Sequence, residues 1–245
     1  MKKVFLIFGF VCFMGASAFA GPFDKFNSVL DGATTDKQAQ KYLDNLASDL
    51  GSVMTGGSFG VSSSLGLANF NLNVRLANTN VSNEIMDAEG TTVLYMPILQ
   101  AEFGLPYDID LIGRYSYSYD SSLYGLGARY TVYDSSVMFI PSVSVQGIYS
   151  ILKTNAGDNK LDTDNIALAT VATFGIPFVT PYVGIGWDTT TVKPQSSNKQ
   201  YLSGTASNVG YSAGVAISVL MINGNVGVTI YDGEPNYNFG ISAGF

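Results

Sequence analysis

Histidine is missing from all 245 residues of the chain, and Cys12 is its single cysteine. Without histidine, a Ser–His hydrolase, an Asp–His protease and a histidine-based metal site are all excluded. Cys12 lies in the N-terminal apolar segment, so the rest of the chain has neither a disulfide nor thiol chemistry. We therefore expect no enzyme, no cofactor and no metal site.

Charge is also scarce. Charged residues make up 13% of the chain, about half of the usual share for a soluble domain, while aromatic residues make up another 13%. After residue 20, no apolar run approaches the roughly 18 residues that a membrane-spanning helix needs. The formal net charge of −7 also excludes a nucleic-acid binder, which needs a basic surface to neutralise phosphates.

The first twenty residues have the pattern of a secretory signal peptide. Lys2 and Lys3 give a positive start, residues 4–14 are apolar, and Ala18–Phe19–Ala20 is an A-x-A cleavage site. The alternative, a membrane anchor, is disfavoured because the apolar stretch is too short to span a bilayer comfortably. The mature chain is expected to begin at Gly21, with 10 basic and 19 acidic residues.

Strict alternation of apolar and polar residues recurs from about residue 69 to the end. In one segment Phe70, Leu72, Val74 and Leu76 alternate with asparagines and Arg75, and nine further segments show the same period of two. In each, the larger apolar residues share one face and the other carries Gly, Ser, Asn and charges. A soluble sandwich would have polar outer faces, so the pattern favours an antiparallel transmembrane β-barrel of about ten strands, with twelve as the alternative count.

The connections and aromatic residues fit this barrel. Short turns alternate with longer polar stretches, which predict loops at 79–91, 152–165 and 191–208. We interpret the aspartates of 158–165 as a solvated loop, because the twelve-residue calcium pattern is missing. The aromatic residues sort into two expected girdles, one near the short turns and one near the loops. These are Phe70, Phe103, Tyr130, Phe139 and Phe174, and Tyr95, Tyr117, Tyr124, Tyr149, Trp187 and Tyr237.

The chain ends on a strand that stops at a phenylalanine. Its apolar positions are Tyr237, Phe239, Ile241, Ala243 and Phe245. This ending resembles the C-terminal strand of bacterial outer-membrane β-barrel proteins, in which it is read by the barrel assembly machinery. The resemblance, which covers about residues 69–245, implies a bacterial outer-membrane location in a Gram-negative envelope. It implies outer-membrane lipids and the assembly machinery as partners.

Residues 21–68 follow a different pattern. Thr35 is a plausible N-cap, and a helical stripe of apolar residues follows it: Tyr42, Leu43, Leu46, Leu50 and Val53. Gly51 or Gly56 could end this helix, and GGSFGVSSSLGL (56–67) reads as a short extended stretch. We expect a plug or rim element, with an amphipathic periplasmic helix as the alternative. A plugged barrel resembles larger transporters of hydrophobic substrates that have an N-terminal hatch.

Five charged residues are expected to face the lumen, among Gly, Ser, Thr and Asn: Arg75, Glu102, Asp110, Arg114 and Arg129. Hairpin pairing is expected to place Glu102 close to Asp110 and diagonal to Arg114, and Arg114 near Arg129. The group is either a structural salt-bridge network or an ion-selective constriction.

Two functions remain for the whole protein. One is a small porin-like channel or transporter for small solutes, hydrophobic ones included. The other is a structural or surface-interaction barrel without transport.

Deleting Phe245 tests the assembly signal. If the last residue is part of a recognition strand, its deletion is expected to lower the amount of folded barrel in the outer membrane while synthesis continues. Heat-modifiable mobility of outer-membrane fractions measures the folded barrel, and an immunoblot of whole cells measures synthesis. An unchanged level of folded barrel would contradict the interpretation of this ending.

Overall fold

The computed structural model describes residues 23–56, 60, 64–81, 84–88, 90–135, 137–138, 140–219, 221–231 and 233–245. The expected signal peptide, its cleavage site and Phe139 lie outside these residues, as does much of the stretch 56–67. None of the helices in the described ranges is long and apolar enough to cross a membrane.

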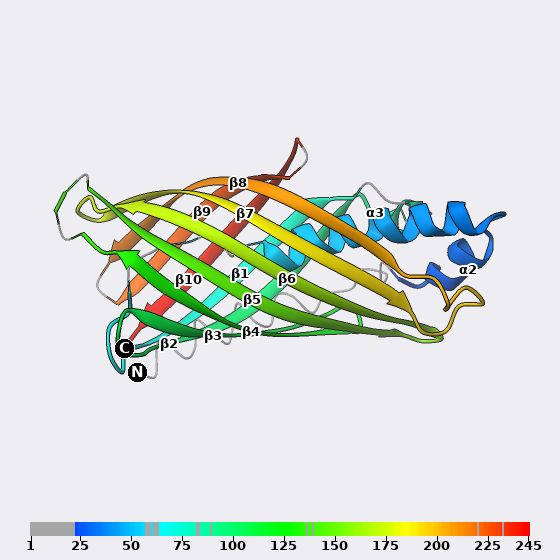
Figure 1. Cartoon of the computed structure of the whole chain (residues 1–245), viewed down its shortest axis with the longest axis horizontal. Helices are drawn as coiled ribbons and strands as arrows, with labels where there is room; N and C mark the ends of the chain where they lie inside the picture. Colours follow the sequence, from blue (N-terminus) through cyan, green and yellow to red (C-terminus); the bar gives the residue numbers. More distant parts are fainter. Residues whose placement is uncertain are drawn as a thin grey trace.

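Ten antiparallel strands form a closed barrel, in which β1 pairs with both β2 and β10 (Figure 1). The strands are β1 (Phe70–Asn80), β2 (Val93–Gly104), β3 (Ile109–Ser118), β4 (Ser121–Tyr133), β5 (Pro141–Ala156), β6 (Asn159–Phe174), β7 (Val179–Pro194), β8 (Gly204–Val219), β9 (Ile222–Tyr231) and β10 (Glu234–Gly244). The fold class expected from the sequence is confirmed, with the lower of the two strand counts.

The alternation of side chains follows the expected faces in every strand. In β1, for example, Asn73, Arg75 and Ala77 are buried inside the barrel, while Phe70 and Leu76 are exposed on the outer surface. The girdle aromatics among the described residues all lie at outward-facing positions of their strands. An apolar exterior with polar groups inside is the arrangement that lipid around the barrel requires.

The last residue closes the barrel. Phe245 donates its backbone N–H to the carbonyl of Phe70 at 2.8 Å, and Phe70 donates to the carbonyl of Phe245 at 3.0 Å. The pairing of β1 with β10 then runs from Asn71, opposite Gly244, to Ala77, opposite Asn238. The C-terminal alternation is therefore one half of the seam between the first and last strands.

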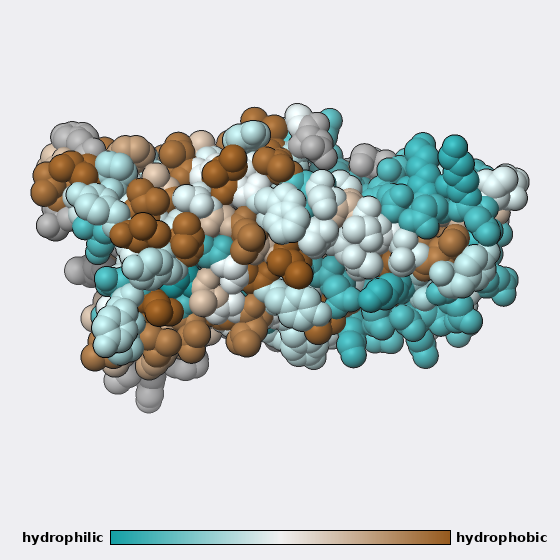
Figure 2. Space-filling view, viewed as in Figure 1, coloured by the Kyte–Doolittle hydropathy of each residue, from teal (hydrophilic) through white to brown (hydrophobic). Residues whose placement is uncertain are grey.

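Two of the expected long loops are strands. Residues 152–165 form the ends of β5 and β6, joined by a tight turn, and the connection between β7 and β8 shortens to 195–203. Each of these four strands has 16 residues, whereas about 9–11 suffice to cross a bilayer. The outer face of these extensions is polar, as expected for strands that continue into water. This polarity is the reason why the sequence pattern predicts loops there. Figure 2 shows this change from a brown band to a teal end.

A helix lies inside the barrel at the loop end. Helix α3 (Asp36–Thr55) packs against β8, β7, β1, β2 and β6, and Leu43, Leu46 and Leu50 are completely buried. Thr35 is its N-cap as expected, accepting a bond from the Gln38 backbone N–H at 3.2 Å. The helix runs through Gly51 and has its C-cap at Gly56. Two short helices lie near it: α2 (Phe26–Asp31), and α4 (Glu84–Ala88) in the β1–β2 loop (Figure 1).

A charge scan along β8 tests the position of the membrane. Val215 faces outward in the apolar band opposite Val226, so Val215→Arg is expected to lower the free energy of unfolding by roughly 2–4 kcal/mol. Thr205 faces outward on the same strand in the polar extension, so Thr205→Arg is expected to change it by less than about 0.5 kcal/mol. Urea unfolding in phospholipid vesicles measures both. Equal costs would mean that the polar extension does not leave the membrane.

Candidate functional site: the filled lumen

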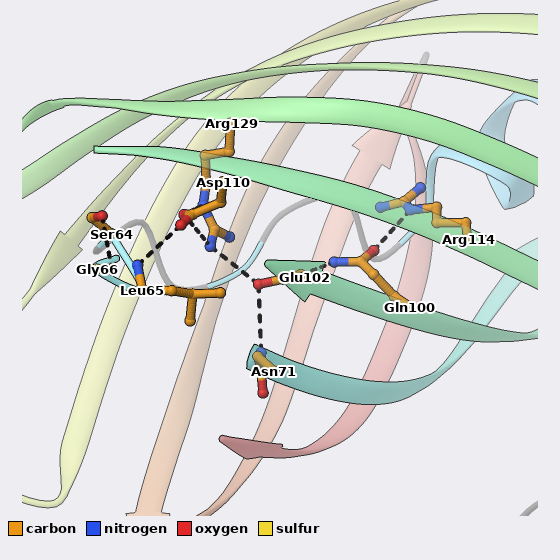
Figure 3. A network of polar contacts seen from close by, with 9 residues as sticks. All are labelled: Ser64, Leu65, Gly66, Asn71, Gln100, Glu102, Asp110, Arg114 and Arg129. Carbon is orange, nitrogen blue, oxygen red and sulfur yellow. Dashed lines mark hydrogen bonds and ion pairs between the residues drawn. The ribbon is translucent and has the colours of Figure 1, made fainter. Parts of the chain in front are cut away.

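Arg129 is the centre of a buried ion cluster at the short-turn half of the lumen (Figure 3). Its Nη2 lies 2.8 Å from Oδ2 of Asp110 and 3.1 Å from Oε2 of Glu102, and its Nε donates to the same Asp110 oxygen at 3.0 Å. The β3–β4 register places Asp110 directly opposite Arg129. Glu102 and Asp110, expected to be neighbours, are thus brought together by one shared guanidinium.

Arg114 is linked to this cluster indirectly. The β2–β3 register places it opposite Gln100, whose Oε1 accepts from Arg114 Nε at 2.7 Å. Gln100 in turn donates to Glu102, so the expected Glu102–Arg114 proximity takes the form of a bridge through an amide. Among the described residues, Arg114 has no direct hydrogen bond or ion pair with a carboxylate. Arg114 and Arg129 both face the lumen, but they are not direct neighbours. The residue of β4 that lies opposite Arg114 is Gly125, whereas Arg129 lies opposite Asp110.

The segment that leads from α3 to β1 is tied to the same cluster. The Leu65 backbone N–H donates to Oδ1 of Asp110 at 3.2 Å, and the Asn71 amide donates to Glu102 at 3.4 Å. Gly60 lies so close to Arg75 that an added Cβ would sit 3.1 Å from its Nη2. All five predicted lumen charges are therefore buried at this level, as three guanidinium groups and two carboxylates.

Helix α3 approaches the barrel wall closely on its polar side. A Cβ at Gly51 would lie 2.5 Å from Thr190 Oγ1 and 2.7 Å from Asp188 Oδ1, so a larger residue there would require these side chains to move. Ser48 donates to Oδ1 of Asn208 at 3.0 Å. Gly204 of β8 allows an equally close approach from the barrel wall, because a Cβ at this position would overlap the backbone of Leu43.

An apolar half of the lumen packs against the helical segment formed by α2, α3 and α4. This corrects the expectation of an interior lined with small and polar residues between the charges. We call this surface the apolar trough; it is formed by inward-facing residues of β2, β4, β5 and β6: Leu94, Met96, Ile98, Leu123, Leu152, Ala156 and Leu161. They form one buried cluster with Leu43, Leu46, Leu50, Val53 and Met54 of α3, with Phe26 and Leu30 of α2, and with Ile85 and Met86 of α4.

Two aspartates hold the start of the helical segment at the loop end. Asp31 of α2 accepts from the Ser197 hydroxyl and from the Asn198 backbone N–H at 3.0 Å. Asp36 accepts from Lys199 Nζ at 2.9 Å and from the Tyr201 hydroxyl at 2.8 Å. These donors, with the Lys199 bond first, hold the pKa of Asp36 below its ordinary value. Both contacts join the N-terminal segment to the β7–β8 connection.

Several of these contact residues are not distinguishable in the sequence. Gln100, Asp188 and Asn208 lie on inward faces that also carry other polar residues, and their importance comes from the position of α3. The apolar trough does leave a signal in β2. Residues 93–99 (VLYMPIL) are apolar on both faces, which indicates that the inner face also packs against protein.

Comparison with known proteins identifies a family. A family model, described as a family of unknown function (DUF6588), matches residues 83–245. The chain belongs to this family. No curated protein has a matching sequence.

Solved structures with a similar fold are outer-membrane β-barrels. The COG4313 outer-membrane channel from Pseudomonas putida F1 is 7% identical, with a TM-score of 0.51 over 76% of this chain and 98% of that one. A KdgM porin in complex with disordered oligogalacturonate is 9% identical, with a TM-score of 0.38 over 71% and 99%. Omp33 of Acinetobacter baumannii is 8% identical, with a TM-score of 0.35 over 73% and 98%.

Because the two sequences are only 7% identical, the similarity to the P. putida channel is evidence for the fold alone. That fold is the closed barrel of bacterial outer-membrane proteins, in agreement with the architecture and the location expected from the sequence.

Removing the shared cation tests the ion cluster. Arg129→Met leaves Glu102 and Asp110 buried without their common partner, so the free energy of unfolding is expected to fall by about 3–5 kcal/mol. Lys193→Gln removes an exposed pair with Asp164 and is expected to cost at most about 1 kcal/mol. Urea unfolding of the refolded barrel measures both. Similar losses in the two variants would exclude a structural role for the cluster.

Proposed function

We propose that the protein is a non-enzymatic outer-membrane channel or transporter for small solutes whose lumen is plugged by its N-terminal helix. The observation that carries the proposal is the position of α3, which is buried inside the barrel and contacts five of its strands. A ten-stranded barrel has more interior than its own side chains fill, since eight strands already leave just enough space for side chains. The helix occupies this additional space.

The chemistry of the helix–wall contact favours a plug that can leave. Toward β6 and β8, α3 is held by hydrogen bonds of Thr55 with Asn165 and of Ser48 with Asn208, which water can replace. A hydrogen bond of this kind contributes only about 0.5–1.5 kcal/mol net. The rim contacts of Asp31 and Asp36 are exposed and equally replaceable.

A structural or surface-interaction barrel is the second candidate. The buried cluster around Arg129 favours it, because a network that ties β2, β3, β4 and the Leu65 segment together has the form of a permanent filling. In that case the helix is a second filling element and the protein conducts nothing. We propose outer-membrane lipids and the barrel assembly machinery as partners in either case.

A reversible cross-link distinguishes the two functions. The expected mature chain has no cysteine, so Ser48→Cys combined with Asn208→Cys introduces a single disulfide, at a pair whose side-chain oxygens lie 3.0 Å apart. In planar bilayers, conductance is expected to be suppressed in the oxidised variant and to appear on reduction, at the level of the wild type.

The matched control places the disulfide in the wall alone. Thr191 and Thr205 are direct neighbours on β7 and β8, with hydroxyls 3.2 Å apart on the exposed face. The double variant Thr191→Cys, Thr205→Cys is expected to conduct equally when oxidised and when reduced. A barrel that conducts in neither redox state, and in neither variant, has the structural function instead.

A further inference from the structure

We propose that α3 occupies the binding site of a single-chain amphiphile with an anionic head group, a long-chain fatty acid, and that Arg114 binds its carboxylate. The inference rests on the proposed function and names its substrate class. It comes from two observations: the apolar trough, and a buried cation without a carboxylate partner at its inner end.

The trough needs an apolar occupant. Leu94, Met96 and Ile98 point inward from β2, and residues of β4, β5 and β6 extend the same surface. In a lumen vacated by α2 and α3, the part of this surface that they cover would be exposed to water, at a cost of roughly 25 cal/mol per Å² of apolar area. A polar solute does not remove this cost, whereas an acyl chain does.

Arg114 lies at the inner end of the trough. Its Nη1 donates to the carbonyl oxygen of Met54 at 3.4 Å, and Met54 is itself part of the apolar cluster. The carbonyls of the last helical turn carry partial negative charge, so the helix presents to Arg114 an apolar body with a negative end. That is also the chemistry of a fatty acid.

The guanidinium has capacity for a further acceptor. Arg114 is 5% exposed, and its Nη2 has no hydrogen-bond partner among the described residues. Glu102 and Asp110 are both engaged by Arg129, so these two carboxylates pair with Arg129 rather than with Arg114. A carboxylate that replaced Met54 O could receive two parallel N–H bonds, the favoured geometry of an arginine–carboxylate pair.

The dimensions fit one chain. From Leu43 to Met54 the helix covers about 17 Å of trough at 1.5 Å per residue. The other half of the lumen is lined by Asn208, Thr229 and Asn238, which are buried polar residues suited to water rather than to a second acyl chain. The geometry therefore favours a single-chain lipid over a phospholipid.

Binding of radiolabelled palmitate to the barrel in nanodiscs tests the proposal, with the Ser48→Cys, Asn208→Cys variant as the host. Reduction is expected to add about one palmitate per barrel above the oxidised state, whose identical lipid surface gives the background. The Thr191→Cys, Thr205→Cys barrel is expected to show no redox difference. Hexadecanol is expected to compete at least about tenfold more weakly than unlabelled palmitate, because it lacks the charge that strengthens bonds to Arg114.

Arg114→Gln in the same host is expected to weaken palmitate binding about tenfold or more, while Lys153→Gln, which removes a cation from the outer surface, leaves it unchanged. The palmitate–hexadecanol comparison keeps the test decisive if the Arg114 variant does not fold. Equal competition by acetate and palmitate would indicate a site for small anions and would overturn the proposal that the ligand is an amphiphile.

Conductance and binding separate the two proposals. Conductance that appears on reduction without additional palmitate would overturn the amphiphile site and leave the channel. Additional palmitate without conductance would overturn the channel and leave the site. A reduced barrel that gains neither would overturn both.

Discussion

The closure of the backbone ladder between β1 and β10 is the constraint on which the rest of the structure depends. In a hydrocarbon environment an unpaired edge leaves a row of amide groups without partners, so the first and last strands must meet. The reciprocal bonds of Phe70 and Phe245 complete that seam at the short-turn end. Once the ladder is closed with ten strands, its inner diameter is fixed, and so is the volume that the protein must fill.

The lumen is filled in two different ways along its axis. Near the short turns, where the surrounding wall faces lipid, Arg129 and its two carboxylates fill the space with buried ion pairs. Toward the loop end, where β5–β8 continue into water, a helix fills it instead. The long strands and the helix belong together, since Leu152, Leu161 and Val192 of the extensions face inward onto the helical segment.

The sequence predicts the outer surface better than the interior, for a physical reason. Lipid acts on each outward position separately, so the period-two pattern of Phe70, Leu72 and Val74 is sufficient to assign faces, and every strand follows it. Interior positions depend on what lies opposite them. Met96 and Ile98 face inward and pack in the buried cluster that includes the helical segment, and a side chain at Gly51 would meet Thr190 and Asp188 of the opposite wall. The second of these pairings joins segments more than 100 residues apart, and neither leaves a local periodicity.

The distribution of contacts along α3 gives its displacement a direction. At the inner end, Arg114 holds the Met54 carbonyl and the following segment is tied to Asp110 through Leu65, all within a buried cluster. At the outer end, Asp36 meets Lys199 in water, where salt and solvent screen the attraction. If α3 is displaced as proposed, the outer end is expected to open first, so that the apolar trough would become accessible from the loop side before the bond to Arg114 is broken. An incoming acyl chain would displace the helix progressively and reach the guanidinium last.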